Sequence, residues 1–212
     1  MGLIATATGP HIFWITSRAA GVCALVLSSL SVAVGVSIGA RLIRRPAAEL
    51  RVAHEALTLA TLAAIAVHGL ALLGDGYLRP NVVDIAIPFV GSYETFWTAA
   101  GIVAFWMMLV LGLSYYARAR IGVQRWRSLH RLTALAWILG LVHSLGEGTD
   151  SGKAWFLATT VAVALPALAL LALRWLGRAS TPAAAEPEQR LAARASVSRA
   201  PRPTAPALGE TR

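Results

Sequence analysis

Four of the five histidines in this sequence lie inside long apolar stretches, namely His54, His68, His130 and His143. The first two are fourteen positions apart and the last two are thirteen positions apart. An ionisable side chain at membrane depth is rare and usually faces the interior of a helix bundle. There an imidazole can ligate a metal, relay a proton or hydrogen-bond to a neighbouring helix. Each histidine alone fits the last role, so their arrangement must decide.

The stretches that hold the histidines belong to a chain dominated by apolar residues. Of its 212 residues, 57% are hydrophobic and 14% are charged, whereas an ordinary soluble domain has about 25% charged residues. A helix that crosses a bilayer needs ~20 apolar residues. Five segments are long enough: 12–40, 50–73, 95–117, 127–145 and 153–176. The sequence therefore predicts an all-α fold, a polytopic transmembrane helix bundle with five spans in contact with membrane lipid.

The arginines between these segments predict the orientation of the bundle. Two links on one side carry eight of them: Arg41, Arg44, Arg45, Arg51, Arg118, Arg120, Arg125 and Arg127. The loops on the other side carry only Arg79 and Lys153. The positive-inside rule then places the N-terminus outside and the C-terminus in the cytoplasm. Because topology accounts for the net charge of +9, we expect no nucleic-acid partner. We expect a multi-pass protein of a cell membrane, most simply the bacterial cytoplasmic membrane.

Three parts follow one another along the chain. A short external N-terminus (1–11) precedes the membrane domain (12–176), and a tail (177–212) rich in Ala, Pro, Ser and Arg follows it. The tail has no hydrophobic period, which predicts a disordered cytoplasmic segment. In the longest loop, the apolar stretch "VVDIAIPF" is expected to lie on the membrane surface or to cap the bundle. The single cysteine excludes an intramolecular disulfide and a cysteine-based metal site.

The predicted orientation sorts the four histidines into two pairs. The second and fourth segments both run from inside to outside, so His54 and His130 lie near the cytoplasmic end. His68 and His143 lie toward the outer end, ~20 Å away at the rise of an α-helix. Two imidazoles at one depth are what bis-histidine haem ligation needs. Zinc would need more ligands at each pair, and a proton relay normally needs carboxylates at depth, where only Glu55 near the cytoplasmic boundary is a candidate. The spacing predicts two haems.

The thirteen-residue step raises a geometric problem. On a straight helix the rings of His130 and His143 would point ~140° apart, whereas a step of fourteen leaves only ~40° between His54 and His68. A bend near Gly140 or two haems lying at different angles could resolve this.

Other residues near the histidines have two interpretations each. Arg18 could pair with a propionate of an outer haem and Arg131 with one of an inner haem, or both could extend to lipid headgroups. Gly69 and Gly140 could admit a flat macrocycle or serve close helix packing.

The sequence resembles the ferric reductase-like transmembrane domain family. The likeness lies in the two unequal histidine spacings on alternate helices, in "WRSLHRLTALAWILGLVHSL" (126–145) and in "WITSRAAGVCALVL" (14–27), and it extends over about 12–176. Many relatives have six spanning helices and continue into cytoplasmic FAD and NADPH domains. Residues 177–212 carry no G-x-G-x-x-G phosphate loop. We therefore expect a separate flavoprotein reductase or a membrane quinol as the electron donor.

The resemblance implies a dihaem b-type cytochrome, an electron-transfer component of an oxidoreductase. His54 and His130 would ligate the inner haem b and His68 and His143 the outer, with an external protein or ferric iron as the acceptor. The alternative is a non-catalytic membrane bundle, permease-like or an assembly subunit, whose histidines only hydrogen-bond between helices.

Overall fold

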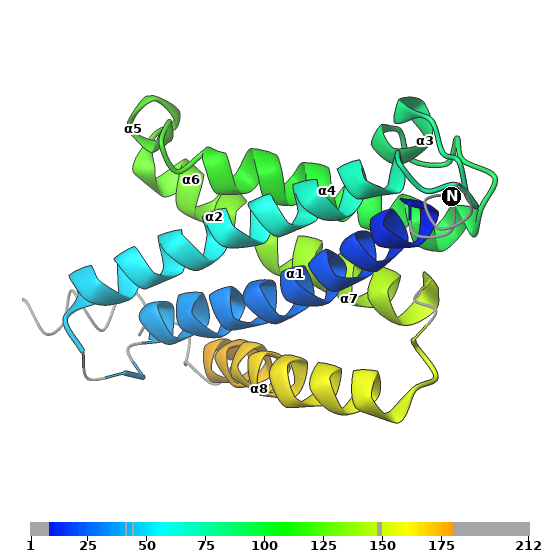
Figure 1. Cartoon of the computed structure of the whole chain (residues 1–212). Coiled ribbons are helices and arrows are strands. Elements are labelled where there is room, and N and C mark those ends of the chain that lie inside the picture. Colours follow the sequence, from blue (N-terminus) through cyan, green and yellow to red (C-terminus); the bar gives the residue numbers. More distant parts are fainter. Residues whose placement is uncertain (1–8, 41, 44, 148–149, 180–212) are drawn as a thin grey trace, which may run out of the picture. The chain divides into compact units, whose positions relative to one another are not determined.

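The structure, a computed structural model, describes residues 9–40, 42–43, 45–147 and 150–179. Within them every regular element is a helix (Figure 1), so the predicted all-α fold is confirmed. The chain divides into two units, Met1–Arg174 and Trp175–Arg212, and the bundle discussed below belongs to the first. Most of the predicted N-terminal segment and of the predicted disordered tail lies outside the described residues, as do Arg41 and Arg44.

The described residues contain eight helices. They are α1 (Gly9–Ala40), α2 (Ala47–Leu72), α3 (Val82–Ala86), α4 (Thr95–Leu113), α5 (Arg118–Ile121), α6 (Val123–His130), α7 (Thr133–Glu147) and α8 (Ala154–Ala179). Of these, α1, α2, α4 and α8 are long and apolar enough to cross a membrane. The chain is therefore a multi-pass membrane protein.

The fourth predicted span is the one that differs from expectation. Instead of one helix over 127–145, α6 ends at His130 and α7 begins at Thr133. At this break the backbone forms hydrogen bonds between residues three apart, as in a 3₁₀-helix, with Leu132 N donating to Leu129 O at 2.9 Å. Because α7 has only 15 residues, or ~22 Å of helix, it is shorter than the ~30 Å hydrocarbon core. Four described helices rather than five thus have spanning length, while α6 and α7 follow one another beside α4 (Figure 1).

Two helix pairs build the bundle. α1 lies along α2, and α4 lies along α7 (Figure 1). Trp137 of α7 is only 1% exposed and packs with Ala164 and Ala167 of α8. Its indole nitrogen donates to Ser29 Oγ of α1 at 3.1 Å. Further buried serines on α1 leave the helix backbones room to approach closely, as is usual between membrane helices.

The apolar stretch of the longest loop contains α3. Asn81 caps this helix through a capping box with Asp84, a local arrangement that satisfies the first free N–H groups of a helix. Trp106 of α4 donates its indole N–H to the Ala86 carbonyl at 2.8 Å, which ties the end of α3 to α4. Several apolar side chains here stay exposed, among them Val82, Val83, Ile87, Phe89 and Val90. Whether they meet the membrane surface remains a prediction from the sequence.

Candidate functional site

The structure brings the four histidines together as two facing pairs. His54 and His68 lie on α2, His130 is the last residue of α6, and His143 lies on α7. The ring centroids of His54 and His130 are 6.1 Å apart with planes at 90°. Those of His68 and His143 are 6.2 Å apart with planes at 70°. The two pairs therefore repeat one arrangement at two levels of the bundle.

The break between α6 and α7 explains how His130 and His143, thirteen residues apart, can each face a histidine of α2. It lies at Arg131 and Leu132, directly after His130, so the two histidines belong to different helices. A bend near Gly140 is one of the two explanations that the sequence leaves open, but the interruption lies before the start of α7, which continues through that glycine. The turn at Arg131 and Leu132 interrupts the regular helix between the two histidines, so the offset of ~140° that holds for one straight helix need not apply to their rings.

Hydrogen bonds at Nδ1 fix three of the four rings. His68 Nδ1 lies 2.8 Å from the Ser17 carbonyl oxygen, and His54 Nδ1 lies 3.0 Å from that of Ser31. His143 Nδ1 lies 2.9 Å from the Trp97 carbonyl oxygen. A carbonyl only accepts, so each Nδ1 carries the hydrogen and each Nε2 keeps a free lone pair. This is the tautomer that a metal-bound histidine normally has.

His130 is held differently. Its Nδ1 is buried and faces the Leu111 carbonyl without a well-formed hydrogen bond, and that carbonyl already accepts from Ser114 Oγ at 2.6 Å. Instead, the ring stacks on Trp126, with centroids 4.9 Å apart and planes at 27°. The Trp126 indole donates to Ser114 Oγ at 3.2 Å. Stacking against a tethered tryptophan thus replaces the backbone bond.

Glycines on the neighbouring helices make room for the three hydrogen-bonded rings. A Cβ atom on Gly21 of α1 would lie 3.1 Å from His68 Nδ1, and one on Gly35 would lie 3.0 Å from His54 Cε1. On α4, a Cβ atom on Gly101 would lie 2.7 Å from His143 Nδ1. A Cβ atom at Gly101 would force the His143 ring to move, and one at Gly21 or Gly35 would make a tight contact with its ring.

The glycines singled out in the sequence are different ones. A Cβ atom on Gly69 would meet nothing within 4 Å, and one on Gly140 would only touch Ala104 at 4.0 Å. The sequence could have pointed to Gly21 and Gly35. They are fourteen residues apart, as are His54 and His68 on the helix packed against them. Matching spacings on two antiparallel neighbours indicate facing residues.

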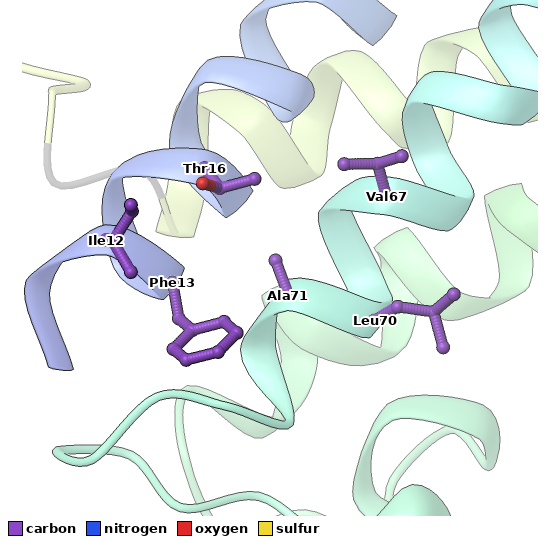
Figure 2. A pocket seen from close by; sticks show the side chains of 6 residues that line it. All are labelled: Ile12, Phe13, Thr16, Val67, Leu70 and Ala71. Carbon is purple, nitrogen blue, oxygen red and sulfur yellow. The ribbon is translucent and has the colours of Figure 1, made fainter. Parts of the chain in front are cut away.

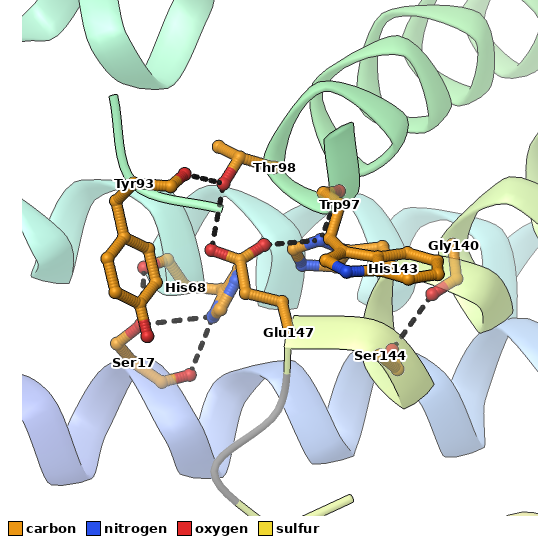
Figure 3. A network of polar contacts seen from close by, with 9 residues as sticks. All are labelled: Ser17, His68, Tyr93, Trp97, Thr98, Gly140, His143, Ser144 and Glu147. Carbon is orange, nitrogen blue, oxygen red and sulfur yellow. Dashed lines mark hydrogen bonds and ion pairs between the residues drawn. The ribbon is translucent and has the colours of Figure 1, made fainter. Parts of the chain in front are cut away.

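A carboxylate that sequence reasoning missed lies beside the His68–His143 pair. Glu147 Oε2 is 2.9 Å from His143 Nδ1, and Glu147 Oε1 accepts a hydrogen bond from Thr98 Oγ1 at 2.9 Å (Figure 3). The expectation that Glu55 is the only carboxylate available to the histidines is therefore wrong. Glu55 instead accepts from the Tyr116 hydroxyl at 2.7 Å. The overlooked signal was spacing, since residues four apart on a helix are neighbours.

The two arginines named from the sequence have contrasting surroundings. Arg18 pairs through Nε with Asp150, in the loop before α8, and its guanidinium lies near the rings of Trp14 and Trp155. Arg131 caps the C-terminus of α6 and is exposed. Their roles toward a propionate remain predictions.

An open apolar groove lies between the ends of α1 and α2 that are near His68. Figure 2 shows its lining: Ile12, Phe13, Thr16, Val67, Leu70 and Ala71. None of these side chains is ionisable, so the groove adds no ligand to the pair.

Comparison with known protein families identifies a match over more than half of the chain. The model of a family described as "Ferric reductase like transmembrane component" matches residues 20–141. The matched stretch includes His54, His68 and His130 and ends two residues before His143. No curated protein and no solved structure matches the chain.

Proposed function

The chain belongs to the ferric reductase-like transmembrane component family, and on this premise we propose that it is a dihaem b-type membrane cytochrome. Members of the family generally bind haem, and membership makes the chain a membrane electron-transfer module. The observation that carries the finer proposal is the pair of facing imidazoles repeated at two levels, with ring centroids 6.1 Å and 6.2 Å apart.

The donor set of each pair fits haem. Two imidazole nitrogens are enough, because the porphyrin supplies the other four ligands of the iron. Within each pair the two rings face one another with centroids 6.1 Å and 6.2 Å apart, so both imidazoles could hold one metal ion between them. The free Nε2 lone pairs and the glycines behind three rings support the same assignment.

Each residue then has a defined task. His54 and His130 form the inner pair and His68 and His143 the outer pair, and when bound the haems supply one-electron redox chemistry. The helices contribute ligation, burial and a fixed tautomer. The arginine distribution supports a cytoplasmic C-terminus and an external N-terminus in a bacterial cytoplasmic membrane. Electrons would enter from a separate flavoprotein or a membrane quinol and leave toward a protein or ferric iron outside.

The haem content of the purified protein tests the proposal. Expressed with ample haem, the full chain should show the absorption spectrum of a reduced b-type cytochrome and about two haems per chain. A colourless preparation would contradict the proposal and favour the non-catalytic bundle. In that case, bonds such as His68 to Ser17 and His143 to Trp97 would serve only to join helices.

Stacking by Trp126 leads to a second expectation. Trp126→Ala removes the ring that orients His130, and lost support around a ligand typically weakens metal binding by about 10–100-fold. We expect haem to dissociate from the inner pair first, while Trp126→Phe, which keeps a stacking ring, retains most of it. Haem-to-protein ratios after dialysis measure this.

A second tryptophan provides the control for this comparison. Trp106→Ala removes an indole that donates to Ala86 instead, so it should leave both haems in place. Equal haem loss in the Trp126→Ala and Trp106→Ala variants would show that the stack has no special role.

A further inference from the structure

We propose that Glu147 is a positioning residue that acts through His143, and that its charge makes the outer pair stabilise an oxidised haem more than the inner pair does. The inference rests on the proposed function, since it concerns the outer of the two haem positions. It assigns a task to a carboxylate that plays no part in ligation itself.

The carboxylate of Glu147 lies beside the outer histidine pair. Glu147 lies one helical turn after His143 on α7, and its Oε2 is 2.9 Å from the ring nitrogen Nδ1 (Figure 3). The Nδ1–H is directed at the Trp97 carbonyl, so Oε2 lies beside that bond rather than on its axis. Oε2 is buried and has no hydrogen bond of its own within the described residues.

A hydroxyl group on α4 holds the carboxylate in this position. Oε1 accepts from Thr98 Oγ1 at 2.9 Å, and the same hydroxyl lies 2.8 Å from the Tyr93 carbonyl oxygen. One oxygen is thus held while the other faces the imidazole. The side chain of Glu147 is only 19% exposed, so water offers its charge limited compensation.

The charge of Glu147 interacts with any positive charge at the outer histidine pair. A buried carboxylate oxygen without a donor is costly, and nearby positive charge reduces that cost. If His143 held a ferric haem, its imidazole would lie next to added positive charge, and one-electron reduction would remove one unit of that charge. The carboxylate would therefore favour the oxidised state of a haem bound there.

The inner pair has different, uncharged neighbours. His54 Nδ1 meets the uncharged carbonyl and hydroxyl of Ser31, and His130 stacks on Trp126. Glu55, the carboxylate next to His54 in the chain, is bonded to the exposed Tyr116 hydroxyl. Among the described residues, a carboxylate thus contacts a ring nitrogen only in the outer pair.

The test is a redox titration of the purified full chain, followed by absorption. Glu147→Gln keeps the size of the side chain and removes its charge. We expect two haems to remain, the midpoint potential of one to shift upward and that of the other to stay unchanged. The shifted component should be the one that His143→Ala abolishes. Glu147→Asp, which keeps the charge, should lie nearer to the wild type than Glu147→Gln does.

Glu55→Gln is the matched control, because it removes a carboxylate next to the other histidine of α2 and should shift neither potential. Unchanged potentials in Glu147→Gln with both haems present would overturn the inference. So would equal shifts in Glu147→Gln and Glu147→Asp, since size rather than charge would then be responsible. A wild-type protein without haem is a different result, because it refutes the proposed function itself.

Discussion

Replacing either histidine of a pair by alanine should remove the same haem, so that the haem content falls from two per chain to one. His54→Ala and His130→Ala should abolish one spectral component, and His68→Ala and His143→Ala the other. The reason is that each iron would need both facing imidazoles, whose ring centroids are 6.1 Å and 6.2 Å apart. Haem extraction, quantified against protein, and redox titration of the remaining component measure the outcome.

Double variants make this expectation sharper. His54→Ala combined with His130→Ala should still retain one haem, whereas His54→Ala combined with His68→Ala should retain none. His11→Ala is the control, because the fifth histidine is exposed near the start of α1 and belongs to neither pair. Haem loss in any other combination, such as a shared component for His54 and His143, would contradict the pairing.

The spanning helices could be predicted from the sequence, because a helix that crosses a bilayer must consist mainly of apolar residues. The long apolar runs of α1, α2, α4 and α8 coincide with predicted spans, since a spanning helix must satisfy its backbone internally and present apolar side chains to lipid. The two segments that carry the histidines were predicted to cross the membrane in the same direction, which pairs His54 with His130 and His68 with His143. The facing rings agree with these pairs.

The break after His130 could not be predicted in the same way. The residues "HRLTAL" contain neither proline nor glycine, the usual causes of a sharp change in a helix. Hydropathy is low over α6 and high over α7, but an average over the whole of 127–145 merges the two parts into one apolar segment. The turn depends on local bonds, such as Thr133 Oγ1 donating to the His130 carbonyl at 2.6 Å, and on packing against α4.

Glu147 was missed for a related reason. The predicted span ended at 145, which placed this glutamate in a loop, whereas α7 continues through it. A boundary error of two residues was enough to hide a carboxylate one turn from His143. Helix ends are where sequence reasoning is least reliable, because capping and packing rather than hydropathy set them.

Adding a single methyl group at Gly101 should displace the outer haem. A Cβ there would lie 2.7 Å from His143 Nδ1, 2.8 Å from Cγ and 2.9 Å from Cε1, closer than atoms in ordinary contact. The ring cannot easily yield, because Trp97, one turn earlier on α4, accepts its Nδ1 hydrogen at 2.9 Å. Gly101→Ala should therefore tilt the imidazole and weaken haem binding at the outer pair by about 10–100-fold. Haem content and redox titration would show loss of one component.

Gly112→Ala on the same helix separates crowding of the ring from effects on the helix. Its Cβ would meet Thr58 Cγ2 at 3.4 Å and Leu62 Cδ1 at 3.8 Å, which is ordinary contact. Alanine is also a better helix former than glycine by about 0.5–1 kcal/mol, so neither substitution weakens α4 through propensity. Gly112→Ala should keep both haems. If Gly101→Ala also keeps both, with unchanged potentials, then the His143 ring does not lie against α4 in the haem-loaded protein, and the assigned outer geometry is wrong.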